Sequence, residues 1–206
     1  MATLYSMTKE MAFMLVRSMT TSLSTATGGS DYRRWRRRSS FSPDWDGRAR
    51  IIAALVPPNS SVIEFGAGTL ALKDFLPRGC QYTPSDLVDR GHGTLVYNLN
   101  GRRLAPIPRH DVAVFGGVLE YVHDIPRLIS ELSHSVECII ASYAVTDSNP
   151  DDRRGRGWVN DLSSTTLLNL FAAHGFQMDR EDRWGSQCIY RLKRAIEPSL
   201  PARSAT

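Results

Sequence analysis

A short apolar run that ends in two closely spaced glycines constrains the fold of this chain more than any other feature. Residues 62–65 are apolar and partly β-branched except for Glu64, which predicts a buried strand, and Gly66 and Gly68 end that strand sharply. The glycines let the backbone approach a ligand closely, and a helix that begins near Thr69 would point free N–H groups at an anion. This segment therefore predicts a nucleotide-like site at the end of a strand.

Length and composition favour one α/β domain. The 206 residues are enough for one well-buried core, and 42% hydrophobic with 22% charged residues is ordinary for a soluble globular protein. The net charge of +4 is mostly local, because residues 33–38 contain five arginines. The three cysteines lie far apart and lack metal-site spacing, so neither a disulfide framework nor a zinc site is predicted. Residues 11–16 are apolar but too few to span a bilayer, so we expect a cytoplasmic protein without stable membrane insertion.

Strands and helices alternate through most of the chain. The last two predicted strands are joined by residues 184–186, which predicts an antiparallel hairpin. Alternation before that hairpin predicts a mainly parallel sheet of seven strands with helices on both faces. Strands are predicted at 62–65, 81–85, 94–97, 111–115, 137–142, 176–180 and 187–192, and helices near Thr69 and at 125–132 and 163–174.

The first part of the chain predicts a helical extension. Residues 1–23 carry an apolar stripe at helical spacing. Residues 24–30, which contain Gly28 and Gly29, have a composition typical of a flexible link. Residues 31–56 predict two helical pieces, the second capped by Ser42. We expect a helical extension over 1–47, the main domain over 48–194 and a flexible tail over 195–206.

Three motifs in order resemble the class I S-adenosylmethionine (SAM)-dependent methyltransferases of the type 11 and type 12 small-molecule group. Val62–Gly68 is similar to the first motif of that family, an apolar strand ending in acid-x-Gly-x-Gly. Asp86 follows Glu64 by 22 residues, where the family keeps a ribose-binding acid. Residues 111–122 resemble the fourth-strand segment, with Leu-Glu-Tyr-Val in place of Leu-Glu-His-Val. The element order over 48–193, about 70% of the chain, matches as well.

The resemblance implies a Rossmann-like fold, SAM as the cofactor and S-adenosylhomocysteine as its product. It implies that Glu64 serves the cationic methionine end and that Asp86 accepts hydrogen bonds from the ribose hydroxyls. Asn98 stands where many relatives hold the adenine amino group with an acid, although it is equally suited to stabilise a turn. The predicted cofactor-binding residues are Glu64, Gly66, Ala67, Gly68, Asp86, Leu87, Asn98, Leu99, Gly116 and Gly117.

A fold that binds a nicotinamide or flavin dinucleotide is the main alternative. Gly66-x-Gly68-x-x-Ala71 satisfies its loose fingerprint, and Asp86 is suitably spaced for it. An acid two residues before the first glycine, however, suits a cation better than a pyrophosphate. Little chain also remains after residue 142 to build the second mononucleotide half. The Leu-Glu-Tyr-Val segment and the closing hairpin favour the methyltransferase interpretation.

Catalytic residues are less clearly marked. His123 and Tyr121 follow the fourth predicted strand, 111–115, beside the expected position of the methyl group. His123 is therefore a candidate general base, and Tyr121 is a second candidate catalytic residue. A loop histidine without a catalytic role is the alternative. Trp158 and Asn160, in the polar loop after residue 142, are candidate acceptor contacts.

The arginines of residues 33–38 leave the acceptor open. Interleaved with Tyr32 and Trp35, they are typical of RNA or DNA binding, but the same residues also suit a helix that packs its aromatic side chains over the cofactor cleft. We favour methyl transfer to a small-molecule or saccharide-like acceptor. The alternatives are a non-catalytic, regulatory SAM- or nucleotide-binding protein and an RNA methyltransferase.

Overall fold

The fold is a seven-stranded sheet in a computed structural model that describes residues 16, 27–149 and 152–195. The strand order is β3-β2-β1-β4-β5-β7-β6. All neighbouring strands are parallel except β5 with β7 and β7 with β6, which confirms the predicted parallel sheet and closing hairpin. The strands are β1 (Ser61–Phe65), β2 (Gln81–Asp86), β3 (Leu95–Val96), β4 (His110–Gly116), β5 (Val136–Tyr143), β6 (Phe176–Trp184) and β7 (Gln187–Arg194).

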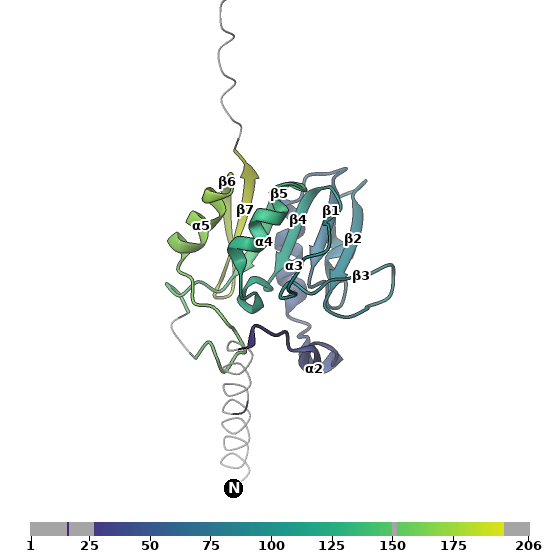
Figure 1. Ribbon diagram of the computed structural model, residues 1–206. Helices are drawn as coiled ribbons and strands as arrows, with labels where there is room; N and C mark the ends of the chain where they lie inside the picture. Colours follow the sequence, from purple (N-terminus) through teal and green to yellow (C-terminus); the bar gives the residue numbers. More distant parts are fainter. Residues whose placement is uncertain (1–15, 17–26, 150–151, 196–206) are drawn as a thin grey trace, which may run out of the picture.

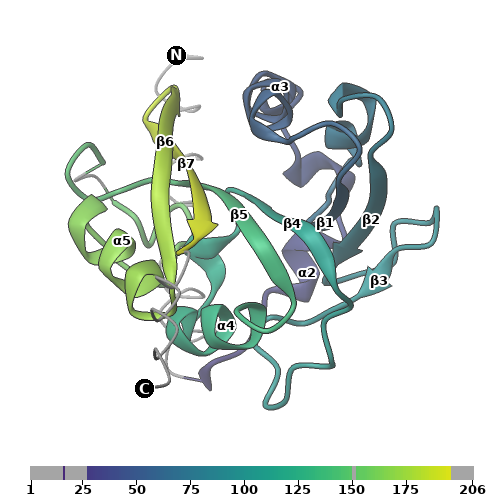
Figure 2. The same ribbon diagram turned by 90° about the horizontal axis from the view of Figure 1, so that it is seen from above.

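Helices cover both faces of the sheet, as predicted. The helix α3 (Trp45–Leu55) lies on one face, whereas α4 (Ile125–Leu132) and α5 (Ser164–Ala173) lie on the other (Figures 1 and 2). Side chains alternate along each strand, so Val62 packs with the α3 core and Ile63 packs with the α4 and α5 core. Buried apolar side chains of the central strands fill both cores, and this burial on alternate faces fixes the register of these strands.

The helix predicted near Thr69 does not form as an α-helix. In its place is η2, a 3-10 helix over Ala71–Phe75, and it follows Leu70 in a left-handed conformation with φ of 66°. Leu76 is extended because it precedes Pro77, so only five residues are left for helical turns. The predicted helix N-terminus that would face an anion is therefore absent from this described segment.

The N-terminal segment crosses the end of the sheet before α3 begins. It contains α2 (Tyr32–Trp35) and the 3-10 turn η1 (Arg38–Ser40), and α2 lies below the sheet in Figure 1. The N-cap of α3 is Asp44 and not the predicted Ser42, because the helix begins at Trp45, and the Asp44 side chain makes no capping hydrogen bond; Ser42 accepts the backbone N–H of Asp44 at 3.3 Å in the turn before the helix. The helix predicted over 1–23, apart from residue 16, and most of the tail predicted over 195–206 lie outside the described residues. Among the described helices, none is long and apolar enough to cross a membrane.

Candidate functional site

A cavity of about 830 Å³ opens where the central parallel strands end. Gly66 follows β1, Asp86 ends β2 and Gly116 ends β4, and all three line this cavity. Ligands of open α/β sheets bind at this edge. Three segments form the opposite wall. The N-terminal segment contributes Trp35 and Phe41, the turn after β4 contributes Tyr121, and the loop after β5 contributes Trp158.

The two motif glycines are required by backbone conformation and by their neighbours. Gly66 has φ of 71° and Gly68 has φ of 54°, in the left-handed region. A Cβ on Gly66 would lie 2.4 Å from Cγ2 of Val118, and one on Gly68 would lie 2.9 Å from Cε1 of Phe41. The backbone of this turn is therefore in direct contact with a ring of the N-terminal segment, and Ala67 between the two glycines also lines the cavity.

Asp86 lines the cavity, and its carboxylate already accepts three hydrogen bonds within the chain. Oδ2 accepts the N–H of Gly68 at 2.9 Å, while Oδ1 accepts the N–H of Val88 at 3.2 Å and Nη2 of Arg90 at 3.0 Å. The same Nη2 donates to the carbonyl of Trp35 at 2.7 Å. A carboxylate has about four acceptor positions. Since three are filled, binding both hydroxyls of a ribose requires Arg90 or Val88 to give up its contact.

Glu64 is almost buried on the α3 face of the sheet and lines the cavity. Tyr82 in β2 donates its hydroxyl to Oε2 of Glu64 at 2.5 Å. Burial raises the pKa of Glu64 to about 8, against the effects of the Tyr82 hydrogen bond and the charge of Arg48. Glu64 is thus a carboxyl whose ionisation is costly without a nearby cation.

Arg48 is the charged residue on the buried face of α3. Its Nη1 donates to Oε1 of Gln187 at 2.9 Å, and the rings of Trp45 and Trp184 lie 5.3 Å and 5.4 Å from its guanidinium carbon. Gly117, at φ of 68°, leaves room for this group, because a Cβ there would lie 2.4 Å from Nη1. Burial lowers the pKa of Arg48, and the nearby charges of Glu120, Tyr121 and Glu64 oppose that change.

Tyr121 lies in the cavity wall, where it contacts Arg34 and Trp35 of the N-terminal segment. The guanidinium carbon of Arg34 lies 4.5 Å from the Trp35 ring centre and 5.1 Å from the Tyr121 ring centre, and Nη2 of Arg34 donates to the Tyr121 hydroxyl at 3.3 Å. Burial raises the pKa of Tyr121, whereas the charge of Arg34 and hydrogen bonds from Trp158 and Arg34 lower it. Because the Tyr121 oxygen accepts the hydrogen bond from Arg34, the phenol has its own proton left to donate.

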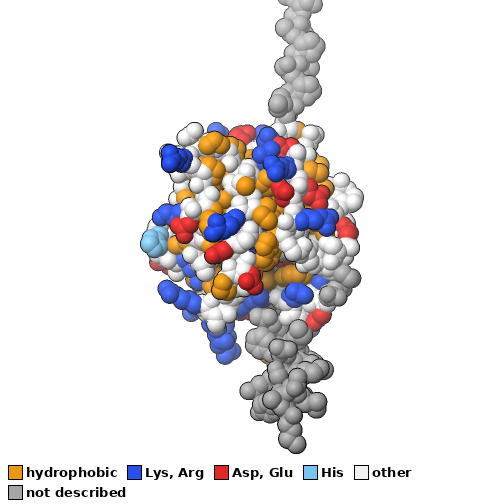
Figure 3. Space-filling view, turned by 180° about the vertical axis from the view of Figure 1, so that it is seen from behind, with side chains coloured by type: hydrophobic (Ala, Val, Ile, Leu, Met, Phe, Trp, Pro, Cys, Tyr) orange, Lys and Arg blue, Asp and Glu red, His pale blue; other side chains and the backbone are white. Residues whose placement is uncertain are grey.

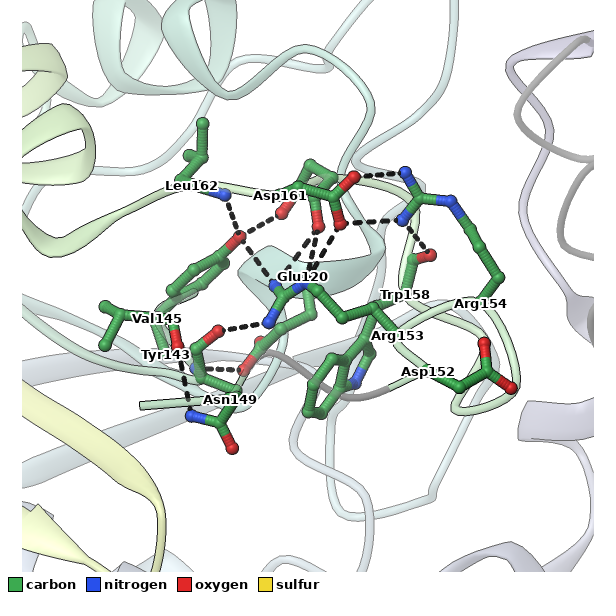
Figure 4. A network of polar contacts seen from close by, with 12 residues as sticks. Glu120, Tyr143, Val145, Asn149, Asp152, Arg153, Arg154, Trp158, Asp161 and Leu162 are labelled. Atoms are coloured by element: carbon green, nitrogen blue, oxygen red, sulfur yellow. Dashed lines mark hydrogen bonds and ion pairs between the residues drawn. The ribbon is translucent and has the colours of Figure 1, made fainter. Parts of the chain in front are cut away.

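The loop after β5 is built around the buried guanidinium of Arg153 (Figure 4). Arg153 donates to the carbonyl of Ala144 at 2.6 Å, to the hydroxyl of Tyr143 at 3.1 Å and to Oδ1 of Asp161 at 2.9 Å. Its guanidinium carbon also lies 4.7 Å from the ring centre of Trp158. These contacts hold Trp158 in the cavity wall, and its contact with an acceptor stays a prediction.

Three of the residues predicted for the site do not line the cavity, namely Asn98, His123 and Asn160. Oδ1 of Asn98 accepts the hydroxyl of Ser30 at 2.8 Å and the N–H of Asn100 at 3.0 Å, which is the turn-stabilising role. His123 has its ring Nε2 3.1 Å from the carbonyl of Gly29, so this nitrogen carries the proton. Asn160 lies outside the lining as well, where its Nδ2 donates to the carbonyl of Leu119 in η3 (Leu119–Tyr121) and to that of Val122 just after it. The predicted residues that do line the cavity are Glu64, Gly66, Ala67, Gly68, Asp86, Leu87, Leu99, Gly116, Gly117, Tyr121 and Trp158.

Sequence reasoning missed Arg48, Phe41 and Gln187, which also line the cavity. A signal for Arg48 was available, because it lies one helical turn before Ile52 and therefore on the apolar stripe of α3. A charged residue on such a stripe is an exception that calls for a partner. Phe41 and Gln187 carry no comparable signal, since each reaches the cavity only through the packing of distant segments.

Several solved structures of known proteins have a similar fold. No protein-family model and no curated protein matches the sequence. The 1,6-didemethyltoxoflavin-N1-methyltransferase of Burkholderia thailandensis, with S-adenosylhomocysteine bound, aligns over 91% of this chain and 90% of its own, at 16% identity and a TM-score of 0.61. The mitomycin 7-O-methyltransferase MmcR aligns over 90% and 67%, at 15% identity and 0.62. The cyclase SpnF aligns over 74% and 81%, at 13% identity and 0.58.

At sequence identities of 13–16%, the similarity to these structures shows the fold alone. The chain therefore has the fold of the class I SAM-dependent methyltransferases, which confirms the fold class predicted from its three motifs. SpnF shows that a protein with this fold can be a cyclase. The activity of this chain has to be argued from its own site.

Proposed function

We propose that this protein is a SAM-dependent methyltransferase that acts on a small-molecule or saccharide-like acceptor. The observation that carries the proposal is the meeting of Asp86, Glu64 and the two left-handed glycines in one cavity at the carboxyl end of the sheet. A ribose suits the carboxylate of Asp86, and Leu87 and Leu99 supply apolar surface for the adenine on the same side. The neighbouring structures that contain S-adenosylhomocysteine support the same cofactor.

Positioning and exclusion of water account for the proposed reaction. The cofactor supplies a methyl group on a sulfonium, and its transfer requires an acceptor atom held in line at close range. Trp35, Tyr121 and Trp158 form an aromatic wall that keeps water from the acceptor side, and the Tyr121 hydroxyl is left to donate to the acceptor. No histidine lines the cavity in the described part of the chain, so His123 is not proposed as a base.

Without a histidine base, the proposed enzyme needs an acceptor atom that reacts without losing a proton to a histidine. Orientation alone serves an acceptor atom that is already nucleophilic, such as an amine nitrogen or an oxygen of low pKa. The cavity is lined by aromatic rings and by several arginines, including Arg33, Arg37 and Arg156 at exposed positions. We therefore favour a small acceptor with an acidic or anionic group, which these cations would attract.

Calorimetric titration with S-adenosylhomocysteine tests the cofactor assignment. We expect a micromolar dissociation constant together with an increase in the melting temperature. Neither heat nor a thermal shift at saturating ligand would refute the proposal. Incubation with methyl-labelled SAM and a panel of amine, phenol, carboxylate and sugar acceptors then tests methyl transfer.

A SAM-binding protein without methyl transfer is the second candidate. The specific observation in its favour is that Arg90 and Phe41 already contact Asp86 and Gly68, where the proposed cofactor binds. Calorimetric binding without labelled product on the whole panel would support this candidate over the enzyme.

A further inference from the structure

Arg34 presents an unsatisfied hydrogen-bond donor in the wall of the cavity. Its Nε is buried and has no acceptor in the part of the chain that the structure describes. The two other nitrogens are in use, because Nη1 donates to the carbonyl of Arg156 at 2.9 Å and Nη2 donates to the hydroxyl of Tyr121 at 3.3 Å. A buried donor without an acceptor is costly, so a ligand that supplies an acceptor here is bound favourably.

The guanidinium of Arg34 also lacks a counterion. It pairs with no carboxylate among the described residues. The ring centres of Trp35 and Tyr121 lie 4.5 Å and 5.1 Å from its guanidinium carbon, and these rings stabilise its charge. A ring interacts with the charge as a whole, however, and does not replace an oxygen acceptor at Nε. An anionic group that carries such oxygens therefore meets both needs of this side chain.

The unpaired Nε shares one edge of the guanidinium with Nη2. Through this edge an arginine can bind both oxygens of a carboxylate by two parallel hydrogen bonds. In Arg34 the edge makes only the 3.3 Å contact with Tyr121, which is long for an N–H donor. The Tyr121 hydroxyl accepts that contact and keeps its own proton to donate. Nε of Arg34 and this hydroxyl thus offer one donor to each oxygen of a carboxylate.

Arg34 lies on the side of the cavity that the proposed function gives to the acceptor. Its partner Tyr121 is in the turn after β4, and Arg156 is in the loop after β5. Asp86, which is proposed to hold the ribose, instead ends β2 on the other side of β1. Trp158, which is in the same loop as Arg156, lines the cavity and offers an aromatic surface against which a flat ring can pack.

We propose that Arg34 is a specificity-determining residue for the acceptor, and that the acceptor is a small aromatic carboxylic acid. Its carboxylate binds Nε of Arg34 and the Tyr121 hydroxyl, and its ring packs against Trp158. The carboxylate is thus the anchor of the acceptor. This inference rests on the proposed function, because it names the substrate class of the same cavity.

Aromatic acids and their primary amides test this site, because an acid and its amide differ in charge but hardly in shape. The probes are benzoate, salicylate, anthranilate and para-hydroxybenzoate with the matching amides, titrated by calorimetry into protein saturated with S-adenosylhomocysteine. We expect at least one acid to bind about tenfold or more tightly than its amide. Arg34→Gln should weaken binding of that acid roughly 10- to 100-fold, since hydrogen bonds between charged groups are lost. The same variant should change the affinities for the amide and for S-adenosylhomocysteine by less than about threefold, which also shows that it is folded.

Arg36→Gln is the matched control, because it removes the same charge from an exposed side chain of the same segment that does not line the cavity. Its effect on the acid should stay below about twofold, since solvent and salt screen an exposed charge. The inference would be overturned if no acid is preferred over its amide, if Arg34→Gln weakens acid and amide equally, or if the two variants act alike. If the unmodified protein does not bind S-adenosylhomocysteine, the proposed function fails instead. Acids and amides can still be compared without that ligand, so the two failures are distinguishable.

Discussion

The carboxylate of Asp86 is shared among three donors within the chain, two backbone N–H groups and the guanidinium of Arg90. Its place at the end of β2 agrees with the strand predicted over 81–85 and with the spacing from Glu64 that the family resemblance implies. The contact with Arg90 was not predicted, although the two are four residues apart. It follows from the way Trp35 places its carbonyl above the site.

Replacing Asp86 by alanine is expected to weaken binding of S-adenosylhomocysteine by about tenfold or more, because hydrogen bonds to a charged group are lost. Calorimetry measures the affinity, and thermal unfolding checks that the variant is folded. The exposed neighbour Asp89→Ala is the control and should bind normally. An unchanged affinity for Asp86→Ala would disprove the ribose assignment.

Glu64 should make stability depend on pH. Because burial raises its pKa from 4.5 to about 8, the folded protein retains a proton between these values that the unfolded chain releases. The free energy of unfolding therefore falls as pH rises through this window, and the contribution is complete below the unfolded pKa. Glu64→Gln removes the titration, so its stability should decline less than that of the unmodified protein between pH 5 and pH 8.

Urea unfolding of both proteins across this window measures the difference, which isolates Glu64 from the other titrating groups. Parallel stability curves for the two proteins would contradict the expected ionisation of this carboxyl.

Tyr121→Phe tests the proposed role of the phenol. The substitution keeps the ring against Trp35 and removes only the hydroxyl that Arg34 contacts. We expect lower kcat/KM with an identified acceptor, by roughly 10-fold for one lost hydrogen bond, and an unchanged affinity for S-adenosylhomocysteine. A large loss of cofactor affinity with normal turnover would place Tyr121 on the cofactor side instead.

Secondary-structure elements differ in how well the sequence predicted them. The helix α4 begins and ends where its apolar spacing predicted, with Asp124 accepting the N–H of Arg127 at its start. The prediction of an α-helix after Gly68 was wrong. Leu70 is left-handed and Pro77 follows soon after, so only the short helix η2 fits between them. The β3 strand has two residues, Leu95–Val96, where four were predicted. An edge strand pairs on one side, so its length depends on a single neighbour.

The loop after β5 should depend on Arg153 for its stability. Arg153→Met would leave the carbonyl of Ala144 and other buried acceptors without a donor, which we expect to lower the free energy of unfolding by about 1–3 kcal/mol. Arg154→Met is the matched control; its more exposed pair with Asp161 is expected to contribute at most about 1 kcal/mol. Equal losses for the two variants, measured by urea unfolding, would contradict the role given to Arg153.

At the scale of the whole molecule, the arginine-rich segment is divided between the interior and the surface. Blue side chains gather at the lower left of Figure 3, where α2 lies when the molecule is seen from behind. Arg34 and Trp35 turn inward to Tyr121, whereas Arg33, Arg36–Arg38 and Tyr32 are exposed. The surface thus keeps the charges for phosphate contact but has lost the tryptophan that base stacking would use.

We therefore expect no RNA binding that depends on these arginines. The unmodified protein and a variant with Arg33, Arg36, Arg37 and Arg38 replaced by glutamine should elute at similar salt concentrations from immobilised single-stranded RNA. Stronger, salt-sensitive retention of the unmodified protein would instead support an RNA methyltransferase.

The sequence by itself determined the sheet and the place of the site. Strand alternation, the glycines after Phe65 and the acid at Asp86 are local signals, and they act through backbone conformation and side-chain direction. Tertiary structure alone decided which charges meet. Arg48 donates a hydrogen bond to Gln187, which is 139 residues away in the sequence. Ser30 donates one to Asn98, which is 68 residues away. Whether a polar group is free for a ligand depends on burial and on such distant partners, and no local pattern encodes them.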